Sequence, residues 1–205
     1  MPDSGKGKRN MSTTQPIRDR KQLDQFKEYY KIKKPDYRNY ALIILGLNTA
    51  LRISDILHLT LENVYNGKKV RTHITIRERK TGKENRIFLN DRVRQVLAAY
   101  RKALIKTRMY KSGNPYLFPS PRSEGQPLSR FQAYRIISAA ADGVGIEDTV
   151  SCHSLRKTFG YHAWKQGKDP IVIMVLFNHS SLNITKRYLC LEQDDKDTVL
   201  RETTL

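Results

Sequence analysis

Apolar residues recur at helical spacing through most of the chain. Leu23, Phe26 and Tyr30 share one face of the segment 20–34, which predicts an amphipathic helix. The segment 37–51 is apolar nearly all round, so we expect a buried, central helix there.

Five further helical segments and a final pair are predicted downstream, and most follow a residue that can act as an N-cap. An N-cap side chain accepts a hydrogen bond from an otherwise unpaired N–H group of the first turn. Asp36 stands in this position before the central helix. The other predicted helices are 55–59 after Ser54, 91–104 after Asn90, 130–137 after Ser129, 154–166 before Gly167, 170–177 after Asp169, and the pair 182–191 and 194–201.

One stretch changes period. The segment 71–90 alternates, is rich in β-branched residues and is broken at Thr81-Gly82, which predicts a two-stranded hairpin with its turn in "KTGKE". The segment 111–129 is rich in turn residues and is expected to form a long surface loop. The predicted fold class is therefore α+β, mainly α, with one small antiparallel sheet in a single domain.

Charge narrows the class of partner. The 205 residues carry a formal net charge of +18, with a pI of about 10.0, and 39% of them are apolar. Such a surface attracts polyanions, so double-stranded DNA or another nucleic acid is the leading partner, and its binding should weaken with salt. An anionic membrane surface is the weaker alternative, because no segment is a basic amphipathic anchor and no apolar run could span a bilayer.

Cysteine usage favours a reducing, intracellular setting. Cys152 and Cys190 cannot make a disulfide framework, and small buried apolar roles suit them better than nucleophilic ones. The polar start of the chain is no signal peptide. We expect residues 1–15 to form a flexible basic leader that need not belong to the natural protein, with Met11 as the alternative start.

Several kinds of catalytic site are excluded by missing motifs. There is no P-loop, because position 77 is Arg where that motif needs Gly, and no His-Glu-x-x-His or zinc knuckle is present. Acidic pairs suited to two-metal chemistry are also missing. We therefore expect no metal and no cofactor, and a phosphate would have to be stabilised by the protein's own cations.

Candidate cations are spread along the chain, and each has an ordinary structural alternative. His153 and Arg156 lie within one turn of a predicted helix start, which suits a phosphate. Arg52 follows the central helix, and Asp55 could orient its guanidinium, although a simple helix-end ion pair would look the same. Lysine at a hairpin tip, as at Lys80, often serves solubility alone.

Two more candidates lie near the end of the chain. His179 falls in a predicted interhelical loop, and Tyr188 follows nine residues later. Because Leu189 and Leu191 flank Tyr188, its ring could simply belong to the core.

Taken in order, these residues resemble the catalytic domain of the tyrosine recombinases, the phage-integrase family of DNA breaking-and-rejoining enzymes. The resemblance covers about residues 20–190. It rests on Arg52 in "ALRISDIL", Lys80 in "ERKTGKENRIFL", His153 and Arg156 in "HSLRKTF", His179 in "NHSS" and Tyr188 in "TKRY". Three positions depart from the common pattern: Asn178 replaces Gly, Lys157 replaces a second His, and Cys190 replaces a polar residue.

The resemblance implies an integrase-like fold and a role for each residue. Tyr188 would be the nucleophile that forms a 3′-phosphotyrosyl link, without metal or ATP. Arg52, Arg156 and His179 would stabilise the phosphate, Lys80 would protonate the leaving 5′-oxygen, and His153 would handle the tyrosine proton. Plausible contacts to DNA phosphates are Lys83, Arg86, Arg130, Arg135, Lys157, Lys186 and Arg187.

The resemblance also implies an assembly. Members act as tetramers on two DNA sites, with the segment after the tyrosine docked on a neighbour, while the free protein could be monomeric. We expect residues 16–205 to be the catalytic domain with a tail over 191–205, and no N-terminal core-binding domain. This is the pattern either of an excised catalytic domain or of the short invertase-type members that lack a core-binding domain. Two alternatives remain open: a type IB topoisomerase, and a DNA-binding regulator that does not cleave.

Overall fold

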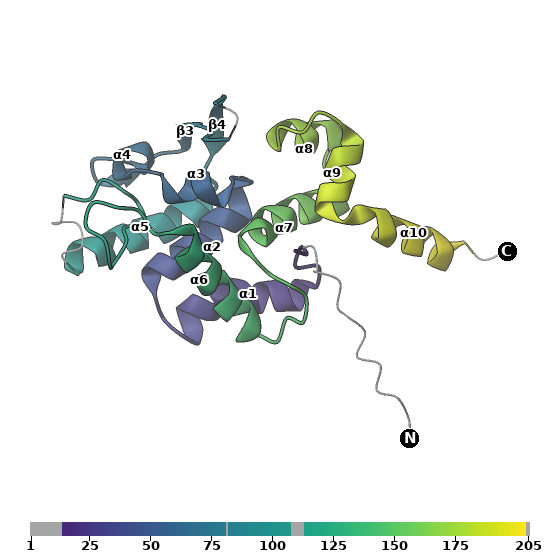
Figure 1. Cartoon of the computed structure of the whole chain (residues 1–205), viewed down its shortest axis with the longest axis horizontal. Helices are drawn as coiled ribbons and strands as arrows, with labels where there is room; N and C mark the ends of the chain where they lie inside the picture. Colours follow the sequence, from purple (N-terminus) through teal and green to yellow (C-terminus); the bar gives the residue numbers. More distant parts are fainter. Residues whose placement is uncertain (1–13, 81, 108–112, 204–205) are drawn as a thin grey trace, which may run out of the picture.

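The computed structural model describes residues 14–80, 82–107 and 113–203, without the side chains of 192–195. It is mainly helical (Figure 1). The helices are α1 (Arg20–Ile32), α2 (Tyr37–Thr49), α3 (Ile53–Leu57), α4 (Leu61–Val64), α5 (Asp91–Lys106), α6 (Arg130–Asp142), α7 (Cys152–Lys165), α8 (Pro170–Leu176), α9 (Leu182–Leu189) and α10 (Leu191–Glu202). The strands are β1 (Tyr65–Asn66), β2 (Lys69–Val70), β3 (His73–Arg77) and β4 (Glu84–Phe88).

Helix α2 is the centre of the larger hydrophobic core. It packs against α1, α5 and α7, and ten of its thirteen residues are buried. An all-round apolar sequence gives this result because no face of the helix is left for water. The predicted cap is confirmed: the Asp36 carboxylate accepts a hydrogen bond from the Asn39 backbone N–H at 2.9 Å.

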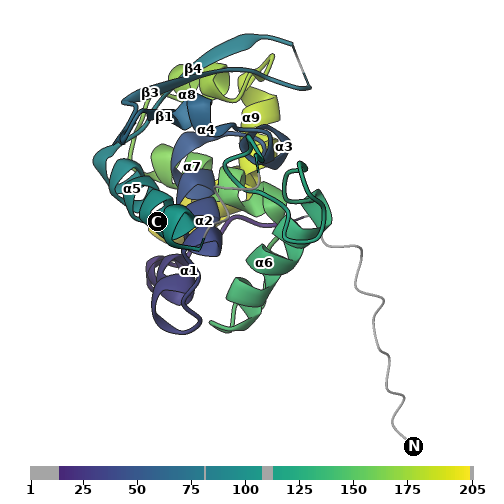
Figure 2. The ribbon, with the colours of Figure 1, turned by 90° about the vertical axis from the view of Figure 1, so that its left-hand side faces the viewer.

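The predicted hairpin is confirmed. Strands β3 and β4 pair antiparallel, with Ile74 opposite Ile87 and Thr75 opposite Arg86. Ile74 and Ile87 are buried and anchor the hairpin to the helices. The hairpin lies at the same end of the molecule as α8, and α1 lies at the opposite end (Figures 1 and 2). A second pair, β1 with β2, was not predicted, because two-residue strands carry no readable alternation.

Two local predictions are wrong. Ser54 lies inside the first turn of α3, whose N-cap is Arg52. The segment 113–129 is not simply a surface loop, because Leu117 and Phe118 have no exposed surface. A bridge from Thr60 to Tyr116 ties this segment to the residues before α4, and a bridge from Pro119 to Pro127 closes the segment on itself. Turn residues determine the backbone path of the segment, and its few apolar side chains are buried because this removes apolar surface from water.

The C-terminal helices form a smaller hydrophobic cluster. Tyr161 of α7, Ile173 and Phe177 around α8, and Leu189 and Leu191 around α9 and α10 are buried together. Helix α10 then extends away from the body of the molecule (Figure 1). The second core matters for the site, because the junction between the two clusters is where the candidate residues meet.

The first described residues lie against α7 and the segment that precedes it. The backbone N–H of Gln15 donates to the Thr149 carbonyl at 3.1 Å, and the Thr14 carbonyl accepts from Lys157. Thr14 and Gln15, the last two residues of the predicted leader 1–15, make these contacts, and its first thirteen residues lie outside the described part of the chain.

Candidate active site

Arg52 is placed by a sharp turn between two helices. Ala50 ends α2 in the left-handed region, at φ 54°, which turns the chain into α3. The Arg52 guanidinium then forms an ion pair with Glu78, with 2.6 Å between Nη1 and Oε2. The arginine side chain keeps 17% of its surface exposed while the glutamate keeps only 1%, so Arg52 still has donors to offer outward.

Glu78 is the site residue that sequence reasoning missed. Besides Arg52, its carboxylate accepts from the side-chain amides of Asn85 at 3.2 Å and Asn178 at 2.8 Å. A buried carboxylate needs such partners, because taking an unpaired charge out of water is costly. The sequence signal was one acid within the basic run "RERK", which reads as an ordinary surface charge.

Asp55 has a different role from the predicted one. Its carboxylate accepts a hydrogen bond from the Arg79 backbone N–H at 3.0 Å. Asp55 therefore fastens the hairpin loop to α3, and the ion pair of Arg52 is made by Glu78. Both acids act on the loop that carries Lys80, so the position of that loop is fixed from two sides.

Lys80 and His153 lie at the edge of the site. Lys80 is exposed in the hairpin loop, as predicted, and His153 is exposed at the start of α7. The Arg130 guanidinium approaches the His153 ring at 3.3 Å. Burial, then the charges of Arg130, Lys157, Arg156 and Lys80, lower the pKa of His153. His153 is therefore a neutral imidazole near pH 7, beside four cations.

Arg156 is buried, with 4% of its surface exposed. Its guanidinium donates to the carbonyls of Ala50 and Phe177, the latter at 2.8 Å, and lies over the Phe177 ring at 4.4 Å. These contacts tie α7 to the turns after α2 and α8. Burial lowers the pKa of this guanidinium, but arginine starts so high that it stays charged.

His179 and Tyr188 complete the cluster. Their ring centroids are 5.1 Å apart, and both rings pack against Phe177, at 5.5 and 5.7 Å. Burial raises the pKa of Tyr188, while Arg156 and Arg52 oppose that rise. The phenol is thus a protonated group held near two guanidinium groups, which would stabilise its deprotonated form.

A threonine hydroxyl lies beside one ring nitrogen of His179. His179 Nδ1 lies 3.1 Å from the Thr185 hydroxyl, which can also donate to the Ser181 carbonyl at 3.2 Å. The hydroxyl has one proton, so it serves only one of these acceptors. When it donates to Nδ1, the proton of a neutral His179 lies on Nε2, where it can be given to a ligand.

Asn178 accounts for one departure from the family pattern. Its φ is 51°, in the left-handed region that glycine adopts freely and that asparagine tolerates best among other residues. Its side chain donates to Glu78, a contact that glycine could not make. The loop before His179 is thereby linked to the residue that holds Arg52.

The predicted phosphate contacts divide into three groups by exposure. Lys157 does not reach the surface: it is 4% exposed, and its ammonium donates to the Thr14 carbonyl at 2.6 Å. The prediction of a DNA contact there is therefore wrong. Lys186 is half-buried, with its ammonium 5.5 Å from the Trp164 ring centroid. The remaining five are exposed: Lys83, Arg86, Arg130, Arg135 and Arg187.

Metal-binding groupings are missing from the described part of the chain. Within it, no three His, Cys, Asp or Glu side chains come together in a way that could hold an ion. Cys152 is buried, and burial raises the pKa of its thiol, which suits a packing role.

The titration of His179 should appear in the stability of the fold. Burial, then Arg156 and Arg52, lower its pKa from 6.5 to about 4. The unfolded chain binds this proton below about pH 6.5 and the folded chain only near 4, so stability should fall as the pH drops through that window. Melting temperatures of the wild type and His179→Asn at pH 7 and pH 5 test this. Between pH 7 and pH 5, the melting temperature of the variant should fall less than that of the wild type. Equal falls would contradict the lowered pKa of His179.

Comparisons with known proteins agree on one family. The model of the phage integrase family matches residues 17–194. The probable integrase/recombinase YoeC of Bacillus subtilis (strain 168) is 39% identical over 184 residues, covering 90% of this chain and 93% of YoeC. Tyrosine recombinase XerD of Corynebacterium glutamicum is 30% identical over 171 residues, which is 81% of this chain but only 52% of XerD.

A solved structure supports the fold. The XerH site-specific recombinase, in its post-cleavage complex with palindromic difH substrate, matches with a TM-score of 0.70 at 20% identity, over 93% of this chain and 54% of the XerH chain. The family model spans every candidate catalytic residue from Arg52 to Tyr188. The expected integrase-like fold is confirmed, and the chain belongs to the phage integrase family.

Proposed function

We propose that this protein is a tyrosine-type site-specific DNA recombinase, which cleaves and rejoins DNA through a 3′-phosphotyrosyl intermediate. The observation that carries the proposal is the cluster in which the Tyr188 ring packs against His179 and Phe177, while the buried Arg156 guanidinium lies over the same Phe177 ring. The family membership and the recombinase names of YoeC and XerD support the same activity.

The proposed reaction is an in-line displacement at phosphorus. The Tyr188 oxygen forms the new bond to phosphorus, the bond to the 5′-oxygen breaks, and Lys80 gives that oxygen its proton. The Tyr188 proton passes to His153, a neutral imidazole able to accept it. Charge grows on the non-bridging oxygens, where Arg52 and Arg156 supply fixed donors.

His179 would add a further donor to those oxygens. Because the pKa of its ring is about 4 in the free protein, it donates as a neutral imidazole, from Nε2. This requires the Thr185 hydroxyl to turn from the Ser181 carbonyl to Nδ1 of His179. An arriving phosphodiester favours that arrangement, since a lone pair on Nε2 would face its negative oxygens.

The proposed partner is double-stranded DNA, bound as a tetramer of this chain on two sites. The net charge of +18 and the five exposed cations support DNA binding. Helix α10 supports assembly: it extends from the body, and Val199 and Leu200 on it are 62% and 77% exposed. Those side chains would seat on a neighbouring copy, while the free protein could remain monomeric.

We further propose that residues 16–205 act as one catalytic domain, with 191–205 as the tail that makes the contact between copies. The family match over residues 17–194 supports these bounds. An intracellular location follows from a DNA substrate. None of the described helices is long and apolar enough to cross a membrane.

Trapping of covalent adducts tests the function. The protein is incubated without metal with fragmented host DNA, denatured in SDS, and the attached DNA is sequenced. Adducts concentrated at one sequence are expected. Adducts spread over all sequences would instead favour a type IB topoisomerase, and salt-sensitive binding without any adduct would favour a regulator that does not cleave.

A further inference from the structure

The Tyr188 helix ends in a strained turn. Cys190 follows as the C-cap in the left-handed region, at φ 59°, a conformation that is unfavourable for a non-glycine residue. Cys190 is also the N-cap of α10, and its side chain makes no cap hydrogen bond there. The Cys190 backbone N–H donates to the carbonyls of Lys186 and Arg187, and the remaining contacts of the turn come from other parts of the molecule.

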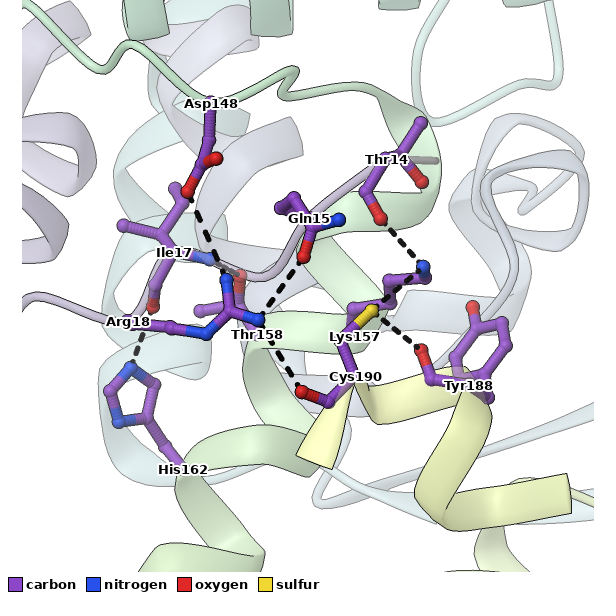
Figure 3. Close-up of polar contacts among 10 residues, drawn as sticks. All are labelled: Thr14, Gln15, Ile17, Arg18, Asp148, Lys157, Thr158, His162, Tyr188 and Cys190. Atoms are coloured by element: carbon purple, nitrogen blue, oxygen red, sulfur yellow. Dashed lines mark hydrogen bonds and ion pairs between the residues drawn. The ribbon is translucent and has the colours of Figure 1, made fainter. Parts of the chain in front are cut away.

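Two cations hold it. The Arg18 guanidinium donates to the Cys190 carbonyl at 3.4 Å, and the Lys157 ammonium lies 3.5 Å from the Cys190 sulfur (Figure 3). The Cys190 thiol in turn donates to the Tyr188 carbonyl at 3.8 Å. The Lys157 ammonium also lies 5.4 Å from the centroid of the Tyr188 ring. Lys157 thus contacts the Tyr188 ring directly, and both cations contact Cys190, whose thiol is bonded to the Tyr188 backbone.

The segment Thr14–Arg18, here called the strap, fixes both cations in turn. The Ile17 N–H donates to the Thr158 hydroxyl at 2.9 Å, and the Ile17 carbonyl accepts from His162 at 2.9 Å (Figure 3). Ile17 is 2% exposed, so the strap is embedded beside α7. Its Thr14 carbonyl accepts from Lys157 at 2.6 Å.

Arg18 is held by a residue of the strap and by two residues outside it. It donates to the Gln15 side chain at 3.1 Å, pairs with Asp148 at 3.8 Å and lies over the Tyr161 ring at 5.6 Å (Figure 3). A guanidinium with so many partners has little rotational freedom, so the N–H group that donates to the Cys190 carbonyl is held in a fixed orientation.

A packing role alone does not explain Lys157. Its ammonium is buried, and no carboxylate in the described residues pairs with it. Burying an ammonium without an opposite charge is costly, and an apolar side chain of the same size would fit the core more cheaply. Lys157 and Cys190 are also two of the three departures from the family pattern, and the structure brings them into contact.

We propose that Arg18 and Lys157 are positioning residues for the nucleophile, which hold the Tyr188–Cys190 turn against the strap so that the phenol is in line with the phosphorus. This rests on the proposed function, because it assumes that Tyr188 attacks the phosphate. Displacing a reacting atom by about 1 Å can slow the reaction about 100-fold.

The test measures single-turnover adduct formation at saturating DNA. Arg18→Gln and Lys157→Met should each slow it at least tenfold without weakening DNA binding, and Arg18→Lys should recover part of the loss. Arg20→Gln, an exposed arginine at the start of α1, is the matched control and should react as fast as the wild type. The double variant should lose less than the product of the two single losses, because both act on one turn.

A substrate with sulfur in place of the bridging 5′-oxygen distinguishes positioning of the nucleophile from protonation of the leaving group. A thiolate leaves without a proton, so this substrate should restore the rate of Lys80→Ala but not of Arg18→Gln or Lys157→Met. Wild-type rates in both variants, or their recovery with sulfur, would overturn the proposal. If Lys157→Met fails to fold, Arg18→Gln decides alone. A wild type without adducts would instead contradict the proposed function itself.

Discussion

Tyr188→Phe should abolish the covalent adduct while leaving DNA binding within about twofold of the wild type. The substitution removes only the phenolic oxygen. The ring keeps its packing against Phe177 and His179, at 5.7 and 5.1 Å, so the fold around the site should persist. Among the six candidate catalytic residues, Tyr188 is the one that carries a hydroxyl group, so its loss removes the proposed nucleophile.

The measurement compares adducts in SDS and binding in a mobility-shift titration on the same DNA. Tyr37→Phe is the matched control, because Tyr37 is a 60% exposed tyrosine on α2 whose phenol has no part in the proposed reaction. That control should form adducts normally. An adduct formed by Tyr188→Phe would assign the nucleophile to another residue.

Arg156→Lys should slow cleavage at least about 100-fold, the usual cost of losing a preorganised donor to a developing charge. The planar fork of Arg156 meets two backbone carbonyls and still has donors left for the phosphate. A lysine ammonium is a single point with three donors, and it cannot span both carbonyls and a phosphate oxygen. The charge is kept, so affinity for DNA should change little.

The rate of adduct formation at saturating DNA checks this expectation, with melting curves to confirm that the variant is folded at the assay temperature. Arg20→Lys provides the same exchange at an exposed position on α1 and should have no effect. A fall in affinity without a fall in the saturated rate would mean that Arg156 binds substrate and transition state equally.

Much of the fold was readable from the sequence because its signals are local. Helix α2 and the hairpin follow from periodicity, and Asp36, Asn90 and Ser129 act as the predicted caps. The burial of Leu117 and Phe118 was not readable, because turn residues dominate the segment around them. Short elements such as α4 have too few residues to show a period.

The candidate site was readable only in part, for a related reason. Motif order identified the six residues, since each sits in a distinctive local sequence. Glu78 was not predicted as a site residue because its role depends on contacts with Arg52 and Asn178, which lie 26 and 100 residues away in the sequence. Lys157 was misjudged because a lysine in a basic protein is usually exposed, and only tertiary packing reveals that this one is not.

Glu78 has one more consequence, which concerns the assembly of the site. Its carboxylate joins Arg52 after α2, Asn85 of β4 and Asn178 of the loop before His179. One buried acid thereby makes the positions of three segments, far apart in the sequence, depend on one another. The hairpin that carries Lys80 is coupled through it to the loop that carries His179.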